Sequence, residues 1–140
     1  MKETLKSGIR YVHKITVPQS KTVPAFYPEA EEFLAMPEVF ATGFLVGFLE
    51  WACIKAINPH LDWPEEQTVG THINVSHEAA TPVGLEVTAM VELIAVEGRK
   101  LFFTVEAHDG VDLISKGTHE RFVIDKAKFE TKAQAKKSGA

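Results

Sequence analysis

The sequence has few of the features that mark secreted, membrane or nucleic-acid-binding proteins. Its one cysteine, Cys53, excludes a disulfide framework, and a reducing cytoplasm is the expected compartment. The first residues lack the apolar core of a secretory signal, so we expect none. The longest apolar stretch, 44–57, is interrupted by Glu50 and Lys55 and is too short to span a bilayer. A formal net charge of −4 argues against nucleic acid as the main partner.

Metal and phosphate motifs are missing as well. The six histidines show no ligand spacing and no HExxH pattern, so we expect no metal site. There is no phosphate-binding glycine loop and no internal repeat. The length of 140 residues and the 45% hydrophobic content are those of one globular domain, which we place at 1–130, with a polar tail at 131–140. Cys53 lies in the apolar stretch, where a buried filler is the expected role.

The predicted elements have a recognisable order. A helix over 42–58 is apolar around most of its circumference, so other elements should surround it. It follows an irregular, proline-rich segment at about 18–40, which is long enough to be a lid. Strands are predicted at 10–17, 68–78, 85–96, 101–107 and 111–125, with a tight hairpin at Asp109-Gly110. One helix wrapped by an antiparallel five-strand sheet is the α+β hot-dog fold, and its unpaired edge predicts a homodimer.

Glu50 is the most informative residue of the helix. Its neighbours one turn away are Val46 and Ile54, and Lys55 points about 140° away from it. A lone carboxylate on a buried face is costly unless another element pairs with it or it takes part in chemistry. The alternative is a structural glutamate that is bonded to the sheet.

The strand over 68–78 places a second polar group on the inner side. Alternation puts the apolar positions of this strand and His77 on one face, whereas His72 falls on the opposite, solvent face. His77 is therefore expected to point toward the side where Glu50 needs a partner. A satisfied core histidine is the alternative interpretation.

Thr42 precedes Gly43 at the start of the helix. Threonine is a favoured helix N-cap, but its hydroxyl and the free N–H groups beside it also suit a carbonyl or an oxyanion. Eight helical residues separate Thr42 from Glu50 by roughly 12 Å along the axis. The two residues can share one site if substrate and His77 bridge them, if the helix entry folds back, or if a second subunit supplies one of them.

Five blocks of the sequence resemble one known family over roughly residues 7–130. They read PEVFATGFLVGFLEWAC, VGTHINVSHEAATPVG, EGRKL, HDGVD and GTHERFVI. They are similar to the fluoroacetyl-CoA thioesterases, which are hot-dog hydrolases. The resemblance implies a homodimer that hydrolyses a small acyl-CoA, with coenzyme A as part of the substrate and no other cofactor. It assigns Thr42, Glu50 and His77 as the catalytic residues.

The same resemblance implies a set of substrate-binding positions. Gly70 matches the glycine whose N–H holds the thioester oxygen, and Phe33 matches a lid aromatic. The family's second lid aromatic falls at Met36, and Phe26 is bulkier than the family residue. The remaining implied positions are Val23 and Arg121. Because methionine is flexible, weak discrimination for fluorine is expected, unless Phe26 restores the aromatic wall.

A thioesterase acting on short acyl-CoA is the function that the sequence favours. Glu50 would attack the thioester carbonyl or activate water, and His77 would orient the base or carry the proton. Thr42 and Gly70 would stabilise the oxygen. One rival is a hot-dog hydratase or dehydratase, and another is a non-catalytic module that binds a small acyl or apolar ligand. Arg99, Lys100 and the tail lysines are candidates for the phosphates of coenzyme A, although solvated surface charge explains them equally.

Overall fold

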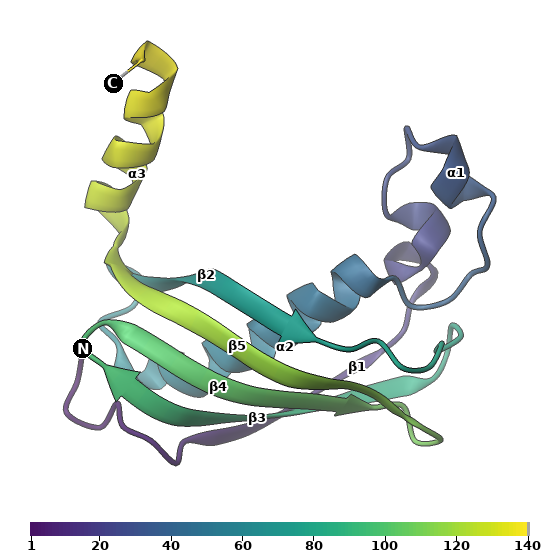
Figure 1. The fold of residues 1–140 in the computed structure, drawn as a ribbon, viewed down its shortest axis with the longest axis horizontal. Coiled ribbons are helices and arrows are strands. Elements are labelled where there is room, and N and C mark those ends of the chain that lie inside the picture. The colour runs from purple at the N-terminus through teal and green to yellow at the C-terminus, as the bar shows by residue number, and fades with distance from the viewer. Residues whose placement is uncertain (140) are drawn as a thin grey trace.

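The computed structural model describes residues 1–139, in which five strands form one antiparallel sheet curled around the helix α2, Thr42–Ile57 (Figure 1). The strand order is β1-β3-β4-β5-β2, so that β1 and β2 are the two edges. The strands are β1, Arg10–Thr16; β2, Glu66–Val75; β3, Glu86–Glu97; β4, Lys100–His108; and β5, Leu113–Asp125. The predicted α+β hot-dog fold is confirmed.

Alternating burial explains how the sheet and helix meet. Residues of β3 and β4 alternate between the apolar core and solvent, which is the period of a strand with one covered face. Leu45, Leu49 and Cys53 of α2 pack into this core. The opposite side of α2 is open in one chain, because Gly47 is exposed and Trp51 is 47% exposed. The single chain therefore surrounds its apolar helix less completely than the sequence predicts.

The lid matches the expected irregular segment. It contains the 3₁₀ turns η1, Gln19–Lys21, and η2, Val23–Ala25, and the short helix α1, Glu31–Leu34. It lies beyond the N-terminal end of α2 (Figure 1). A Cβ atom added at Gly43 would lie 2.0 Å from Cζ of Phe26. Only glycine at this position lets the Phe26 ring pack on the first turn of α2.

Most strand ends lie within two residues of the predicted ones, and two departures change the structure near the site or the hairpin. β2 ends at Val75 rather than at residue 78, and its register shifts between Gly70 and His72, so that simple alternation does not continue to His77. The β4–β5 connection is a four-residue loop rather than a two-residue hairpin. The Asp109 carboxylate organises it by accepting hydrogen bonds from the backbone N–H groups of residues 111 and 112.

The segment after β5 is helical. Asp125 caps α3, Lys126–Ala135, by accepting a hydrogen bond from the Lys128 N–H, and the 3₁₀ turn η4, Lys136–Ser138, follows. Another 3₁₀ turn, η3, Asn58–His60, ends α2 at the predicted stop. α3 extends away from the sheet (Figure 1). Among residues 1–139, no helix combines the length and apolarity needed to cross a membrane.

Candidate active site

Glu50 finds its partner on the sheet rather than on its own helix. Its Oε1 accepts a hydrogen bond from Nη1 of Arg121 at 3.0 Å. Arg121 lies on the inner face of β5 and is 3% exposed, whereas the Glu50 side chain is 38% exposed. The carboxylate therefore sits at the open side of α2, with one oxygen held by a buried cation. The prediction that another element pairs with Glu50 is confirmed, and the prediction that Glu50 lies on a buried face of the helix is wrong for the single chain.

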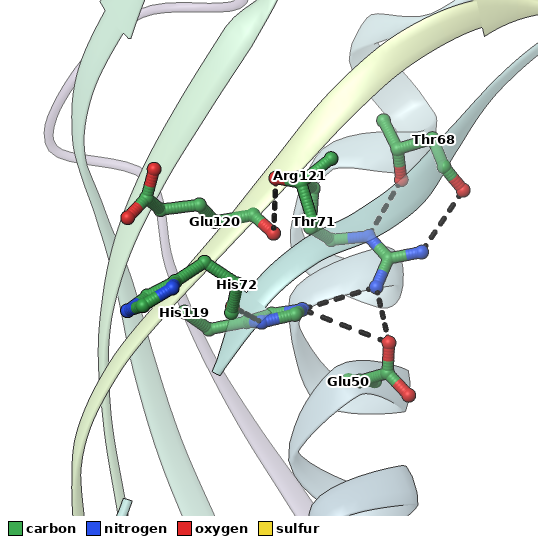
Figure 2. A network of polar contacts seen from close by, with 7 residues as sticks. All are labelled: Glu50, Thr68, Thr71, His72, His119, Glu120 and Arg121. Carbon is green, nitrogen blue, oxygen red and sulfur yellow. Dashed lines mark hydrogen bonds and ion pairs between the residues drawn. The ribbon is translucent and has the colours of Figure 1, made fainter. Parts of the chain in front are cut away.

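Arg121 is the centre of a polar network that Figure 2 shows between α2, β2 and β5. Its Nε donates to the Thr68 hydroxyl at 2.8 Å, and its Nη2 donates to the Thr68 carbonyl at 2.9 Å. Its Nη1 also lies 3.0 Å from Nε2 of His119, whose Nδ1 is 2.7 Å from the carbonyl oxygen of His72. Burial lowers the pKa of the Arg121 guanidinium, and the Glu50 carboxylate opposes that effect. The group stays charged at neutral pH.

Gly70 lies directly against the Glu50 carboxylate. A Cβ at this position would be 2.5 Å from Oε1 of Glu50 and 3.3 Å from Cε1 of His119. The same residues, together with Val46 and Ile73, border a surface hollow. The absence of a side chain thus keeps the approach to the carboxylate open, and it leaves backbone at the position where the resemblance places a thioester oxygen.

Thr42 and His77 form a second polar pair at the start of α2. The Thr42 hydroxyl is hydrogen-bonded to Nδ1 of His77 at 2.7 Å. The helix N-cap is Ala41, and Thr42 is the first helical residue without a capping bond from its side chain, so the predicted capping role of Thr42 is wrong. The chain turns toward α2 after β2 ends, which explains how His77 reaches this position.

His77 is neutral and incompletely paired in this arrangement. Burial lowers its pKa below the ordinary value of 6.5. Its Nε2 is buried without a hydrogen-bond partner in residues 1–139. No hydrogen bond or ion pair joins His77 to Glu50 in that part of the chain, since each residue has another partner. The expectation that His77 pairs with Glu50 is therefore wrong within one subunit.

The expected lid residues divide into two groups. Phe26 makes edge-to-face contacts with Phe33 and Phe44, at ring-centroid distances of 5.7 and 5.1 Å. Val23 borders a hollow that also contains Thr42 and His77. Met36 is 46% exposed and lies outside this aromatic group. The lid thus places Phe26 and Phe33 together over the helix entry, while Met36 remains at the surface.

The sequence analysis missed two members of this network, His119 and Thr68. On β5, residues 119, 121 and 123 share the inner face. The alternation argument that was used for His77 would have found His119 if it had been applied to β5.

Cys53 is the expected buried filler of the core. Burial raises the pKa of its thiol to about 12, so the thiol is not a reactive nucleophile. No group of three His, Cys, Asp or Glu side chains that could hold a metal ion occurs in residues 1–139.

Comparison with known proteins matches this geometry to one family. The model of the fluoroacetyl-CoA-specific thioesterase family, FlK, matches residues 17–127. A fluoroacetyl-CoA thioesterase from Streptantibioticus cattleyicolor is 54% identical over 136 residues, which cover 97% of each chain. The solved structure of the fluoroacetyl-CoA thioesterase FlK is 53% identical, with a TM-score of 0.92 over 96% of this chain and 98% of the other.

A second solved structure shows what this relative binds. It is a mutant of FlK in complex with fluoroacetate and CoA, 55% identical, with a TM-score of 0.86 over 89% of this chain and 99% of the other. The family match covers α2, strands β2 to β5 and both polar pairs described above, whereas β1 precedes the matched residues. The chain belongs to the fluoroacetyl-CoA-specific thioesterase family and is an acyl-CoA thioesterase with the hot-dog fold.

Proposed function

We propose that this thioesterase hydrolyses small acyl-CoA thioesters, fluoroacetyl-CoA among them, at a site that two copies of the chain complete. The observation that carries the proposal is the half-exposed carboxylate of Glu50, held through Oε1 by buried Arg121 and facing side-chain-free Gly70. Such a carboxylate can reach a small carbonyl group without first moving a side chain. The names of the relatives support the choice of substrate class.

A homodimer is the proposed assembly because two adjacent surfaces lack a covering. The side of α2 that carries Gly47 and Trp51 is exposed, and β2 is a sheet edge whose own residue Ile73 is 38% exposed. Edge strands present unpaired N–H and C=O groups, which a second β2 would satisfy. Pairing two copies through this edge would also cover the apolar helix face. A stable, active monomer of 15.5 kDa in sedimentation would contradict this assembly.

The dimer would also bring together the two polar pairs, Thr42–His77 and Glu50–Arg121, which are separate within one chain. Thr42 and Glu50 lie at equal distances along α2 on either side of Val46. If two α2 helices cross antiparallel near Val46, the twofold axis brings Thr42 of one subunit beside Glu50 of its partner. Gly47 has no atom within 4 Å of its hypothetical Cβ, which leaves room for this close approach. Each site would then combine Thr42 and His77 from one chain with Glu50 from the other.

The chemistry follows from these groups. Glu50 either attacks the thioester carbon, forming an anhydride that water then opens, or takes a proton from the water that attacks. In both routes the carbon–sulfur bond breaks, coenzyme A leaves as a thiolate, and a carboxylic acid is released. The Thr42 hydroxyl and the Gly70 backbone would hold the carbonyl oxygen as it gains charge. His77, with its unpartnered Nε2, would carry the proton to or from the leaving groups.

No cofactor is required by this proposal. A thiolate is a good leaving group, so neither a metal ion nor a prosthetic group is needed to activate it, and coenzyme A enters only as part of the substrate. The cytoplasm is the proposed compartment, since the lone thiol of Cys53 is suited to reducing conditions.

A thiol-release assay on a panel of short acyl-CoA substrates tests the activity. Release of free coenzyme A from acetyl-, fluoroacetyl- or butyryl-CoA is the expected result. Binding without release would favour a ligand-binding module. Conversion of an unsaturated acyl-CoA without thiol release would favour a hydratase.

Complementation tests whether the site is shared. The Glu50→Gln and His77→Ala variants, each inactive alone, are mixed under conditions that exchange subunits. If the site is composite, every mixed dimer regains one intact site, and random mixing restores about a quarter of the wild-type activity. If each chain holds its own site, every site carries one substitution and the mixture stays inactive.

A further inference from the structure

His119 is a polar side chain in the apolar core beside the site. It is 2% exposed, and its ring packs nearly parallel to Phe103 of β4, with the centroids 6.3 Å apart. Burying an imidazole costs free energy unless both nitrogens are paired. Both nitrogens are paired here, and the partners show what the ring does.

The hydrogen bonds of His119 determine its tautomer. Nδ1 lies 2.7 Å from the carbonyl oxygen of His72, and a carbonyl can only accept, so Nδ1 carries the proton and donates it. Nε2 of the neutral ring then has a free lone pair and accepts a hydrogen bond from Nη1 of Arg121 at 3.0 Å. The ring is thus a fixed acceptor aimed at the guanidinium.

Arg121 divides its Nη1 hydrogens between two acceptors. Figure 2 shows the guanidinium held on its far side by Thr68, with His119 and Glu50 both reaching Nη1. Nη1 carries two hydrogens. Because one of them goes to His119, only one remains for Glu50, which is bound through Oε1. Among residues 1–139, Oε2 of Glu50 has no hydrogen-bond partner.

We propose that His119 is a positioning residue for thioester hydrolysis: it accepts one Nη1 hydrogen of Arg121 and, with Thr68, fixes the guanidinium so that the other Nη1 hydrogen holds Oε1 of Glu50 and Oε2 is left to act on the substrate. Without this acceptor, the Nη1 hydrogen that faces His119 loses its partner, the guanidinium is free to shift, and the Glu50 carboxylate is no longer held in one position. The inference rests on the proposed catalytic role of Glu50. It adds a residue that acts on the Glu50 carboxylate through Arg121.

The neutral ring is essential to this role. The charged groups that act on His119 are Glu50 from α2 and Arg121 and Glu120 from β5. His72 of β2 contributes only its backbone carbonyl, and the neighbouring Phe103 of β4 is apolar. A proton on Nε2 would turn two donors toward each other and separate the ring from Arg121. Acid should therefore disorder the Glu50 carboxylate at a pH where His119 charges.

Paired substitutions test the proposal in the full-length enzyme. His119→Phe keeps a ring against Phe103 but removes the acceptor, whereas the amide oxygen of His119→Gln can still accept from Arg121. We expect the His119→Phe variant to have a kcat lower on the order of 10-fold or more, with KM nearly unchanged. A small displacement of the reacting Glu50 carboxylate is enough for an effect of this size. The His119→Gln variant should retain most of the wild-type kcat. The acidic limb of its profile of kcat against pH should show one ionisation fewer than that of the wild type. The matched control is His108→Phe, at a half-exposed histidine of β4, and it should leave kcat unchanged.

A measurement on the unmodified protein guards against a folding defect in the variants. ¹⁵N chemical shifts of the His119 ring at pH 7 should report a neutral Nδ1–H tautomer. A charged ring, an Nε2–H tautomer, or wild-type kcat in His119→Phe would each overturn the proposal. Glu50→Gln, assayed in parallel, distinguishes a failure of the proposed function from a failure of the role of His119. If Glu50→Gln is active, the proposed function fails, whereas if it is inactive and His119→Phe is fully active, only the role of His119 fails.

Discussion

Oε1 of Glu50 lies 3.0 Å from Nη1 of Arg121, a residue 71 positions further along the chain. The cation is buried and the carboxylate is half-exposed, so the pair points a fixed negative charge from the core toward the open side of α2. A salt bridge that served stability alone would not need Gly70 beside the carboxylate, where any larger residue would collide with Oε1. The arrangement is therefore suited to chemistry at Glu50.

Substitution of Glu50 by glutamine should abolish most turnover without unfolding the protein. Glutamine keeps the shape and can still accept from Arg121, but it is neither a base nor a nucleophile. The expected loss of kcat is on the order of 10²-fold or more. Glu97→Gln, an exposed glutamate at the end of β3, is the control and should behave as wild type. Near-normal turnover of Glu50→Gln would make the residue structural.

Glu50 and His77 should act as a unit although they are not in contact within one chain. Residues that serve one chemical step show non-additive losses, because removing either one already disables the step. The double variant Glu50→Gln/His77→Ala should be scarcely slower than the worse single variant. Fully multiplied losses in kcat would show that the two residues act independently.

Alanine at Gly70 should impair the site through Glu50. Its Cβ would lie 2.5 Å from Oε1, so the carboxylate must move or lose its bond to Arg121. We expect kcat/KM to fall on the order of 10-fold, the scale typical of a displaced reacting group. The unfolding temperature measured in parallel should also fall, since the buried Arg121 guanidinium loses its carboxylate partner when Glu50 moves. Unchanged kcat/KM would show that the carboxylate tolerates the displacement.

Discrimination for the fluorinated acyl group should be weak. Met36 is exposed and flexible, and packing differences between small acyl groups are worth only about 1–3 kcal/mol. The values of kcat/KM for acetyl-, fluoroacetyl- and butyryl-CoA measure it, and Met36→Phe should raise the preference for fluoroacetyl-CoA. A strong preference in the unmodified enzyme would instead assign the aromatic wall to Phe26, which already packs against Phe33. Phe26→Leu would then reduce that preference.

Stability should decrease in mild acid because of three histidines. Burial is the main cause that lowers the pKa of His13, His77 and His119 below 6.5 in the folded state. The histidines of the unfolded chain bind protons more readily than those of the folded chain. The contribution of these three histidines to the free energy of unfolding is therefore fully present above pH 6.5 and is lost as the pH falls through their pKa values in the folded state. The unfolding temperature should therefore drop between pH 7 and about pH 5. His119→Gln should flatten this dependence, and an identical slope would contradict it.

The local pattern of the sequence was sufficient for most of the fold. Alternation over β3 and β4, the apolar run of α2 and its Asn58-Pro59 stop all concern neighbours in the chain, and the structure confirms them. The position of His77 was harder to predict. The bulge after Gly70 and the early end of β2 depend on pairing with β5, and no periodicity within the strand records that pairing.

Sequence alone thus determined the elements, the fold class and the residues capable of the chemistry, because propensity, periodicity and residue type are properties of short segments. Tertiary structure decided which of those residues meet. Glu50 bonds to Arg121, which in turn bonds to His119, and His77 bonds to Thr42. These partners come from strands and helices that are far apart in the chain. The physical reason is that a hydrogen bond depends on distances of a few ångströms, which only the packing of α2 against the curled sheet fixes.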